Sequence, residues 1–218
     1  MKYFASVKTE KGLNTLPHNP CKLLGFELLK LAAGEQFTGQ TGDREVLAVI
    51  LGGKANFEVD GQKFDKVGGR PNVFNGKPHS VYMPAGADYR IVAEGAVEIG
   101  LTSAPSDLKT VPYVIAPAQV TNGAWGAANF KRYFHQILTQ AGQPALPARR
   151  LIVGETFTPS GNWSTYPPTN TKWTTCPVRL TTRKCITSGS APPTALACAT
   201  ITPARAKRKT LPCATAPL

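Results

Sequence analysis

Short apolar segments separated by tight turns run from Phe26 to Ala104, and this pattern constrains the fold more than any other feature. Glu45–Leu51 (EVLAVIL) is apolar enough for a buried strand and ends at Gly52-Gly53. Lys54–Val59 alternates apolar and polar residues before the turn pair Asp60-Gly61, which is typical of a β-hairpin. Six or more expected strands without a long amphipathic helix favour an all-β sandwich or jelly-roll barrel.

A second group of elements is expected beyond this barrel. Leu151–Phe157 (LIVGETF) predicts another buried strand, and Thr158–Pro168 (TPSGNWSTYPP) predicts a loop that approaches a site. From residue 169 onward the apolar residues follow neither the period of a strand nor that of a helix. We therefore expect a first barrel over residues 1–110, a linker and the start of a second barrel over 111–168, and an irregular, disordered tail over 169–218.

The net charge of +12 is concentrated in this tail. Residues 169–218 hold eight Lys or Arg and no Asp or Glu, which leaves 17 basic and 13 acidic residues, a net charge of +4, in residues 1–168. Cysteine is divided in the same way, since Cys21 is the only one before residue 169 and four follow it. A nearly balanced body with one cysteine argues against a disulfide framework and favours a cytoplasmic protein.

The sequence gives little support for a secreted, membrane or nucleic-acid-binding protein. Residues 1–12 carry no apolar run behind a basic head, so we expect no signal peptide there. We also expect no membrane partner, because no stretch approaches the ~18 apolar residues of a membrane helix. The basic cluster Lys207–Lys209 lacks interleaved aromatic residues, so we expect no specific nucleic acid and at most salt-sensitive attraction to phosphate.

Four segments within residues 25–168 resemble the 5-deoxy-glucuronate isomerase family, which is related to the deoxy-hexosulose-uronate ketol-isomerases. The longest is PARRLIVGETFTPSGNWSTYPP at 147–168, and the others are GFELLKLAAGEQF at 25–37, VGGRPNVFNGKPHSVYMPAG at 67–86 and NFKRYFHQIL at 129–138. The resemblance implies a bicupin, in which two jelly-roll β-barrels share one chain and only the C-terminal barrel holds a metal. For this chain it implies a complete N-terminal barrel, a truncated C-terminal barrel and an irregular basic tail.

The resemblance also implies an enzymatic activity. The family converts 5-deoxy-glucuronate to 5-dehydro-2-deoxy-gluconate, an aldose–ketose isomerisation of myo-inositol catabolism whose substrate is a small sugar acid. The implied cofactor is a divalent metal (Zn, Mn or Fe) that polarises substrate oxygens as a Lewis acid. Its family ligands are two histidines of an H-x-H motif, a glutamate and a later histidine. The H-x-H spacing suits a strand, because alternate side chains point to the same face.

The family pattern breaks at the junction of Pro168 and Thr169. Where the family continues into H-K-H, this chain has Thr169-Asn170-Thr171. A family-like H-K-H-E-V-D-N-L-P can be encoded as CAC AAA CAC GAA GTG GAC AAC TTG CCC, and the same string read one base later gives T-N-T-K-W-T-T-C-P, the residues at 169–177. A family-like continuation shifted in the same way reproduces residues 178–195. We infer a single-base frameshift after Pro168, which also explains the missing acidic residues.

The inferred change of frame removes the metal ligands. Thr169 and Thr171 stand at the H-x-H positions, Lys184 stands at the position of the glutamate, and the later histidine has no counterpart. Threonine hydroxyls are poor ligands, and a lysine ammonium repels a cation. We therefore expect no metal or other cofactor in this chain, assign no catalytic residue, and expect an inactive product of an enzyme family.

Four residues before the break are candidates for contact with a sugar acid. Arg149 and Arg150 could bind the substrate carboxylate, because a guanidinium matches a carboxylate bidentately, or they could form a solvated or interface pair. Glu155 and Trp163 could line the sugar cavity, or they could be a buried strand partner and a core aromatic. Both interpretations stay open on the sequence.

The histidines and the overall organisation leave a second function open. His18, His79 and His135 have no ligand spacing between them, so structural or surface roles are expected for each. The alternative to an enzyme is a non-catalytic cupin module that binds a sugar acid or supports oligomerisation. A homo-oligomer is compatible with either function.

Overall fold

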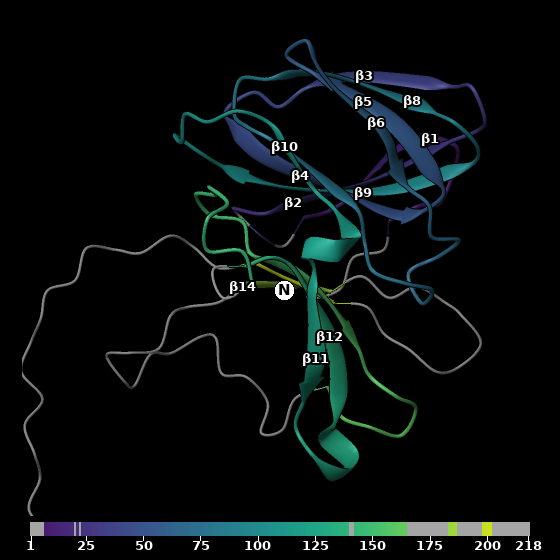
Figure 1. The fold of residues 1–218 in the computed structure, drawn as a ribbon, viewed down its shortest axis with the longest axis vertical. Helices are drawn as coiled ribbons and strands as arrows, with labels where there is room; N and C mark the ends of the chain where they lie inside the picture. Colours follow the sequence, from purple (N-terminus) through teal and green to yellow (C-terminus); the bar gives the residue numbers. More distant parts are fainter. Residues whose placement is uncertain are drawn as a thin grey trace, which may run out of the picture.

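A computed structural model describes residues 7–19, 21, 23–139 and 142–164, together with the backbone of two short strands at 183–186 and 198–201. Two antiparallel sheets form the first barrel (Figure 1), a larger one with strand order β1-β2-β9-β4-β7-β10 and a smaller one with order β3-β8-β5-β6. The strands of the larger sheet are β1 (Gly12–Thr15), β2 (Gly25–Leu31), β4 (Arg44–Gly52), β7 (Ser80–Met83), β9 (Val97–Pro105) and β10 (Tyr113–Ile115). Those of the smaller sheet are β3 (Gln36–Gln40), β5 (Lys54–Val59), β6 (Gln62–Gly68) and β8 (Asp88–Ala93).

A three-stranded antiparallel sheet follows the first barrel in sequence and contains β11 (Thr121–Trp125), β12 (Arg132–Leu138) and β13 (Val153–Phe157) in that order. In Figure 1, the β11–β12 hairpin extends away from the first barrel. Within the described residues, the only helices are two single 3₁₀ turns, η1 (Pro117–Gln119) and η2 (Ala128–Phe130). The all-β class expected from the sequence is confirmed.

The strand predictions agree closely with these bounds. The run EVLAVIL lies inside β4, and the alternating segment before Asp60 is β5 with the expected bounds. Asp60 and Gly61 both have positive φ, 48° and 79°, as the tight turn of the β5–β6 hairpin requires. The family-like segment 129–138 contains the end of η2 and the whole of β12, and the expected strand 151–157 begins at Val153.

Some of the described strands lie in the segments expected as a linker and as an irregular tail. β10 lies in the segment expected as a linker, yet it pairs with β7 at the edge of the larger sheet. Two strands, β14 (Arg183–Ile186) and β15 (Cys198–Ile201), pair antiparallel in the segment expected to be irregular. The other residues of that segment lie outside the described residues, so the expectation for the tail stays a prediction.

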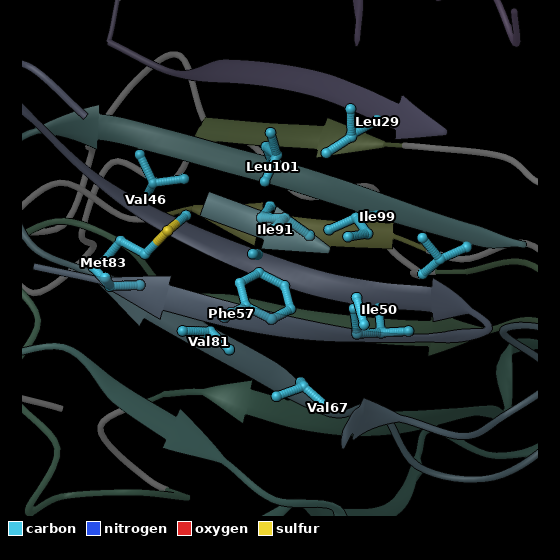
Figure 2. Packing of buried hydrophobic residues seen from close by; sticks show 14 of the residues in the cluster. Leu29, Val46, Ile50, Phe57, Val67, Val81, Met83, Ile91, Ile99 and Leu101 are labelled. Carbon is cyan, nitrogen blue, oxygen red and sulfur yellow. The ribbon is translucent and has the colours of Figure 1, made fainter. Parts of the chain in front are cut away.

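The interior of the first barrel is filled by apolar side chains (Figure 2). Val46, Ala48 and Ile50 point from β4 into this interior, where they pack with Phe57 of β5 and Ile91 of β8. Each of these five residues is at most 7% exposed. Close-packed side chains occupy the space between the two sheets. The first barrel therefore serves as a structural scaffold in the described part of the chain.

The opposite face of the larger sheet is buried as well. Leu47 and Val49 alternate with the inward residues of β4 and belong to a second apolar cluster on the outer face. This cluster also contains Ile137 of β12 and Leu151 and Val153 of the β13 region. β4 is therefore covered on both faces, which is why its sequence is continuously apolar instead of alternating.

Truncation of Phe57 should destabilise the barrel strongly. Phe57 is 1% exposed, so Phe57→Ala removes a buried ring and leaves a cavity. We expect the free energy of unfolding to fall by about 3–5 kcal/mol, measured by urea denaturation. Val111→Ala, at a residue that is 69% exposed, is the matched control and should change it by no more than about 0.5 kcal/mol. Similar losses in the two variants would contradict the assigned core.

Candidate functional site

A buried charged cluster joins the first barrel to the three-stranded sheet. Glu155 of β13 receives two hydrogen bonds from the guanidinium of Arg70, one from Nη2 to Oε1 and one of 3.0 Å from Nη1 to Oε2. Nδ1 of His135 lies 3.0 Å from the same Oε2. Arg70 and Glu155 are each only 6% exposed. This bidentate geometry in a buried setting makes the pair a strong, directional contact.

The backbone around Arg70 determines where its guanidinium points. Gly68 and Gly69 precede it with φ of 114° and 124°, a region that only glycine enters readily. A Cβ at Gly68 would meet the carbonyl oxygen of Gly53 at 2.4 Å, so the chain turns here only because both residues are glycine. Arg70 is then held at its Nε, which donates to the carbonyl of Ile50 at 3.0 Å. The side chain is fixed before it meets Glu155.

The partners of Glu155 on β12 and β13 follow from strand register. His135 lies directly opposite Glu155, and Tyr133 lies opposite Phe157, so these four side chains share one face of the sheet. The ring of His135 meets that of Phe157 edge-on at a centroid distance of 5.0 Å, and Phe74 also contacts Phe157 edge-on at 6.3 Å. The ring of His135 is therefore packed between its contact with Glu155 and its contact with Phe157.

This geometry restricts what Glu155 can do chemically. Both carboxylate oxygens are engaged, one by Arg70 alone and the other by Arg70 and His135. With both oxygens engaged and only 6% of the residue exposed, this carboxylate has little access to a substrate proton. Among the two interpretations left open by the sequence, the described contacts are those of a buried strand partner. Contact with a sugar acid stays a prediction for this residue.

A second buried carboxylate, Glu45 at the start of β4, binds backbone instead of a charged side chain. Its Oε1 accepts from the N–H groups of Arg150 (2.5 Å) and Leu151 (2.8 Å), and its Oε2 accepts from that of Arg149 (2.8 Å). The hydroxyl of Tyr82 donates to Oε2 at 2.7 Å, and Glu45 is fully buried. Burial, together with the hydrogen bond to Glu45, raises the pKa of Tyr82, so this hydroxyl stays a donor.

The structure places the Arg149 and Arg150 side chains on the first barrel. The Nε of Arg149 donates to Asp107 at 2.8 Å, and this hydrogen bond lowers the pKa of Asp107. The Nη1 of Arg150 donates to the carbonyl of Pro105. The Arg149–Asp107 pair is exposed, so both interpretations of the two arginines stay open, and binding of a substrate carboxylate by either guanidinium stays a prediction.

Trp163, unlike the residues of the buried cluster, has an exposed side chain. Its side chain is 62% exposed, and its backbone N–H donates to the carbonyl of Asn129 at 2.7 Å. A core aromatic would be buried, so the core interpretation of Trp163 is wrong within the described residues, because the loop of residues 158–164 lies on the surface. Its role in lining a sugar cavity stays a prediction.

The sequence did not point to Arg70, His135 or Glu45 as partners in these clusters. Arg70 and Glu155 are 85 residues apart, and Glu45 and Leu151 are 106 apart. Pairs at such separations leave no periodic signal in one sequence. The available hint was the position of Glu45 at the head of a continuously apolar strand, where a buried carboxylate requires polar partners.

A divalent metal does not fit the described residues. In the ranges that the structure describes, no group of three or more His, Cys, Asp or Glu side chains could hold a metal ion. The buried cluster offers one carboxylate and one imidazole, but Arg70 directs its positive charge at that carboxylate. The positions matched to the family's ligands (Thr169, Thr171 and Lys184) lie outside the residues whose side chains are described, so the loss of the metal stays a prediction.

Comparison with known proteins decides the family. The KduI/IolB family matches residues 5–170, which is more than three quarters of the chain. The chain belongs to the KduI/IolB family. The resemblance that the sequence segments carry is thereby confirmed, and the match covers both the first barrel and the three-stranded sheet.

Curated relatives bear the name 5-deoxy-glucuronate isomerase. The protein from Geobacillus kaustophilus (strain HTA426) is 38% identical over 146 residues, which cover 66% of this chain and 51% of the relative. The protein from Bacillus subtilis (strain 168) is 34% identical, with 66% and 52% covered. This chain therefore spans about half the length of the curated relatives it matches.

A solved relative supports the fold directly. The crystal structure of an IolB-like protein from Salmonella typhimurium LT2 superposes with a TM-score of 0.67 at 27% sequence identity, covering 74% of this chain and 62% of that chain. The bicupin architecture implied by the family accounts for the complete first barrel and for the strands that follow it. In the described part of the chain, no helix has the length and apolar character needed to cross a membrane.

Removal of Arg70 should destabilise the protein because it leaves Glu155 as a buried carboxylate without its charged partner. We expect Arg70→Ala to lower the free energy of unfolding by about 3–5 kcal/mol in urea denaturation. The double variant Arg70→Met, Glu155→Leu should recover most of this loss, because it removes both charges together. Arg149→Ala is the control, since its ion pair with Asp107 is exposed and should contribute far less. No recovery in the double variant would contradict the proposed cause.

His79 should make stability depend on pH. Burial lowers the pKa of His79, and its Nδ1 accepts a hydrogen bond of 3.0 Å from the N–H of Gly68, which requires the neutral ring. A lowered folded-state pKa means that stability is complete above the unfolded pKa of about 6.5 and is lost as the pH falls through the folded value. Urea denaturation from pH 7.5 to 5 should show this loss. His79→Asn should flatten the dependence, whereas His18→Asn, in an exposed position, should leave it unchanged.

Proposed function

We propose that this chain derives from a 5-deoxy-glucuronate isomerase of inositol catabolism and that the 218-residue product does not catalyse the isomerisation. The observation that carries the proposal is the limit of the family match. The KduI/IolB family matches residues up to 170, next to Pro168, where the codon argument puts a change of reading frame. The name 5-deoxy-glucuronate isomerase, which the curated relatives carry, supports an isomerase acting on a small sugar acid.

The frameshift explains several properties of residues 169–218 with one event. The segment has eight basic and no acidic residues, four of the five cysteines and none of the three histidines. A shifted reading of a family-like H-K-H-E-V-D-N-L-P string reproduces residues 169–177, including Trp173 and Cys176, whose codons are few. Independent selection for a basic tail would not produce this correspondence.

The loss of activity follows from the donor groups at the matched positions. Thr169 and Thr171 offer neutral hydroxyls where the family has imidazoles, and Lys184 offers an ammonium where it has a carboxylate. Divalent metals bind imidazole nitrogen and carboxylate oxygen, and a cation at the third position repels them. Without the Lewis acid, a carbonyl and its neighbouring hydroxyl lack the polarisation that the isomerisation requires.

A second function is favoured by the completeness of the first barrel. Its interior is filled, and its core needs no residue beyond 101 apart from packing at its edge, so it can persist as a fold without the metal centre. We propose as the alternative a non-catalytic, cytoplasmic cupin module that binds a sugar acid or supports homo-oligomerisation. Saturable binding of 5-deoxy-glucuronate by the metal-free chain would favour this alternative over a residual product without function.

Metal content and activity test the proposal together. The purified 218-residue protein should contain no stoichiometric divalent metal in elemental analysis and should not convert 5-deoxy-glucuronate. Inserting one base at the junction of codons 168 and 169 should restore the family reading, metal binding and isomerase activity. A chain that stops after Pro168 is the control, and it should resemble the 218-residue protein in both assays.

Two results would overturn separate parts of the proposal. Stoichiometric metal in the 218-residue protein would contradict the loss of the metal site. A frame-restored protein that binds metal but leaves 5-deoxy-glucuronate unchanged would contradict the assigned reaction.

A further inference from the structure

The first barrel and the β12–β13 pair meet across an apolar interface that is separate from the core of the barrel. Every buried member of the inner cluster comes from residues 29–101. The outer cluster combines the outward side chains of the larger sheet with residues that follow the barrel, among them Ile137, Leu138, Leu151 and Val153. Separation at this interface would remove the outer cluster and leave the inner core intact. We call β12, β13 and the described residues between them the docked segment.

Two buried carboxylates cross this interface in opposite directions. Glu45 reaches from the barrel and accepts the N–H groups of three consecutive residues of the docked segment, 149–151. Glu155 reaches from the docked segment and accepts hydrogen bonds from the two terminal guanidinium nitrogens of Arg70 on the barrel. Glu45 is 0% and Glu155 is 6% exposed. Each half therefore supplies one carboxylate and receives the other.

The two contacts require each other through solvent exclusion. Hydrogen bonds to an ionised group are stronger where water is excluded, and both carboxylates are buried while the docked segment is seated. Opening at one carboxylate admits water to the interface and weakens the other. Strand pairing within the docked segment, with Glu155 opposite His135, keeps its two ends moving together.

We propose that the docked segment opens from the first barrel as one cooperative unit, held closed by the reciprocal carboxylates Glu45 and Glu155, while the barrel itself stays folded. The open state exposes the outer face of β4 and the unpaired guanidinium of Arg70. This device operates independently of metal binding and of catalysis, so it does not depend on the isomerase proposal.

Native-state hydrogen exchange on the full 218-residue chain, followed by mass spectrometry, tests this device. Glu45→Gln keeps the size of the side chain but removes its charge, and Glu155→Gln does the same at the other contact. Glu94→Gln is the matched control, because Glu94 is exposed. Exchange is measured under conditions in which its rate reports the equilibrium population of the open state.

The proposal predicts a reciprocal effect. Glu45→Gln should speed exchange about tenfold or more in β12 and β13, around the distant Glu155, as well as in residues 149–151. Glu155→Gln should speed exchange by a similar factor at residues 149–151, around the distant Glu45. In both variants, amides of β2, β4 and β9 should stay within about twofold of the unsubstituted protein, as should all amides in Glu94→Gln.

Three outcomes would overturn the proposal. Faster exchange confined to the neighbourhood of each substitution would mean two independent contacts, and unchanged exchange would mean that neither carboxylate holds the segment. Faster exchange in β2, β4 and β9 together with the docked segment would mean one cooperative unit for the whole protein. If Glu45→Gln does not fold, Tyr82→Phe removes one donor from the same carboxylate and should give a smaller change with the same reciprocal pattern.

Discussion

The burial of β4 on both faces is the constraint on which the rest of the described structure depends. Val46, Ala48 and Ile50 fill the barrel on one side, whereas Leu47 and Val49 need a cover on the other. An uncovered outer face would expose a broad apolar surface in the middle of the sheet. The strands that follow the barrel supply that cover, so the barrel and the start of the second half form one packed body.

The position of Glu45 follows from the same constraint. It points outward in the alternation of β4, where the docked segment seals it from water, and its partners are three backbone N–H groups together with the hydroxyls of Tyr82 and Ser106. A buried carboxylate is retained when such donors satisfy it. Because almost every residue has a backbone N–H, Glu45 fixes the backbone position of residues 149–151 without requiring particular side chains there. The side chains of Arg149 and Arg150 are then directed to Asp107 and Pro105.

Local patterns predicted the strands well because turns and burial leave short-range signals. The β5–β6 hairpin could be identified from alternation and from Asp60-Gly61, and β4 from its apolar run. The charged cluster left no such signal, because Arg70, His135 and Glu155 come from three elements whose proximity depends on the complete fold. Glu155 was identified as a residue of interest from its place in a family-like segment, but its enclosure by Arg70 and His135 could only be found in three dimensions. Trp163 carried the same kind of signal and lies on the surface.

The two carboxylates also explain how a chain can keep the family fold while its chemistry changes. The contacts of Glu45 and Glu155 involve only residues up to 155, so none of them depends on the reading frame after Pro168. The proposed change of frame at codon 169 would replace the residues matched to metal ligands in one step, yet it would leave the inner core, the outer cluster and both buried carboxylates with their partners. Persistence of the first barrel is thus no measure of activity, and the metal content of the product is the more direct one.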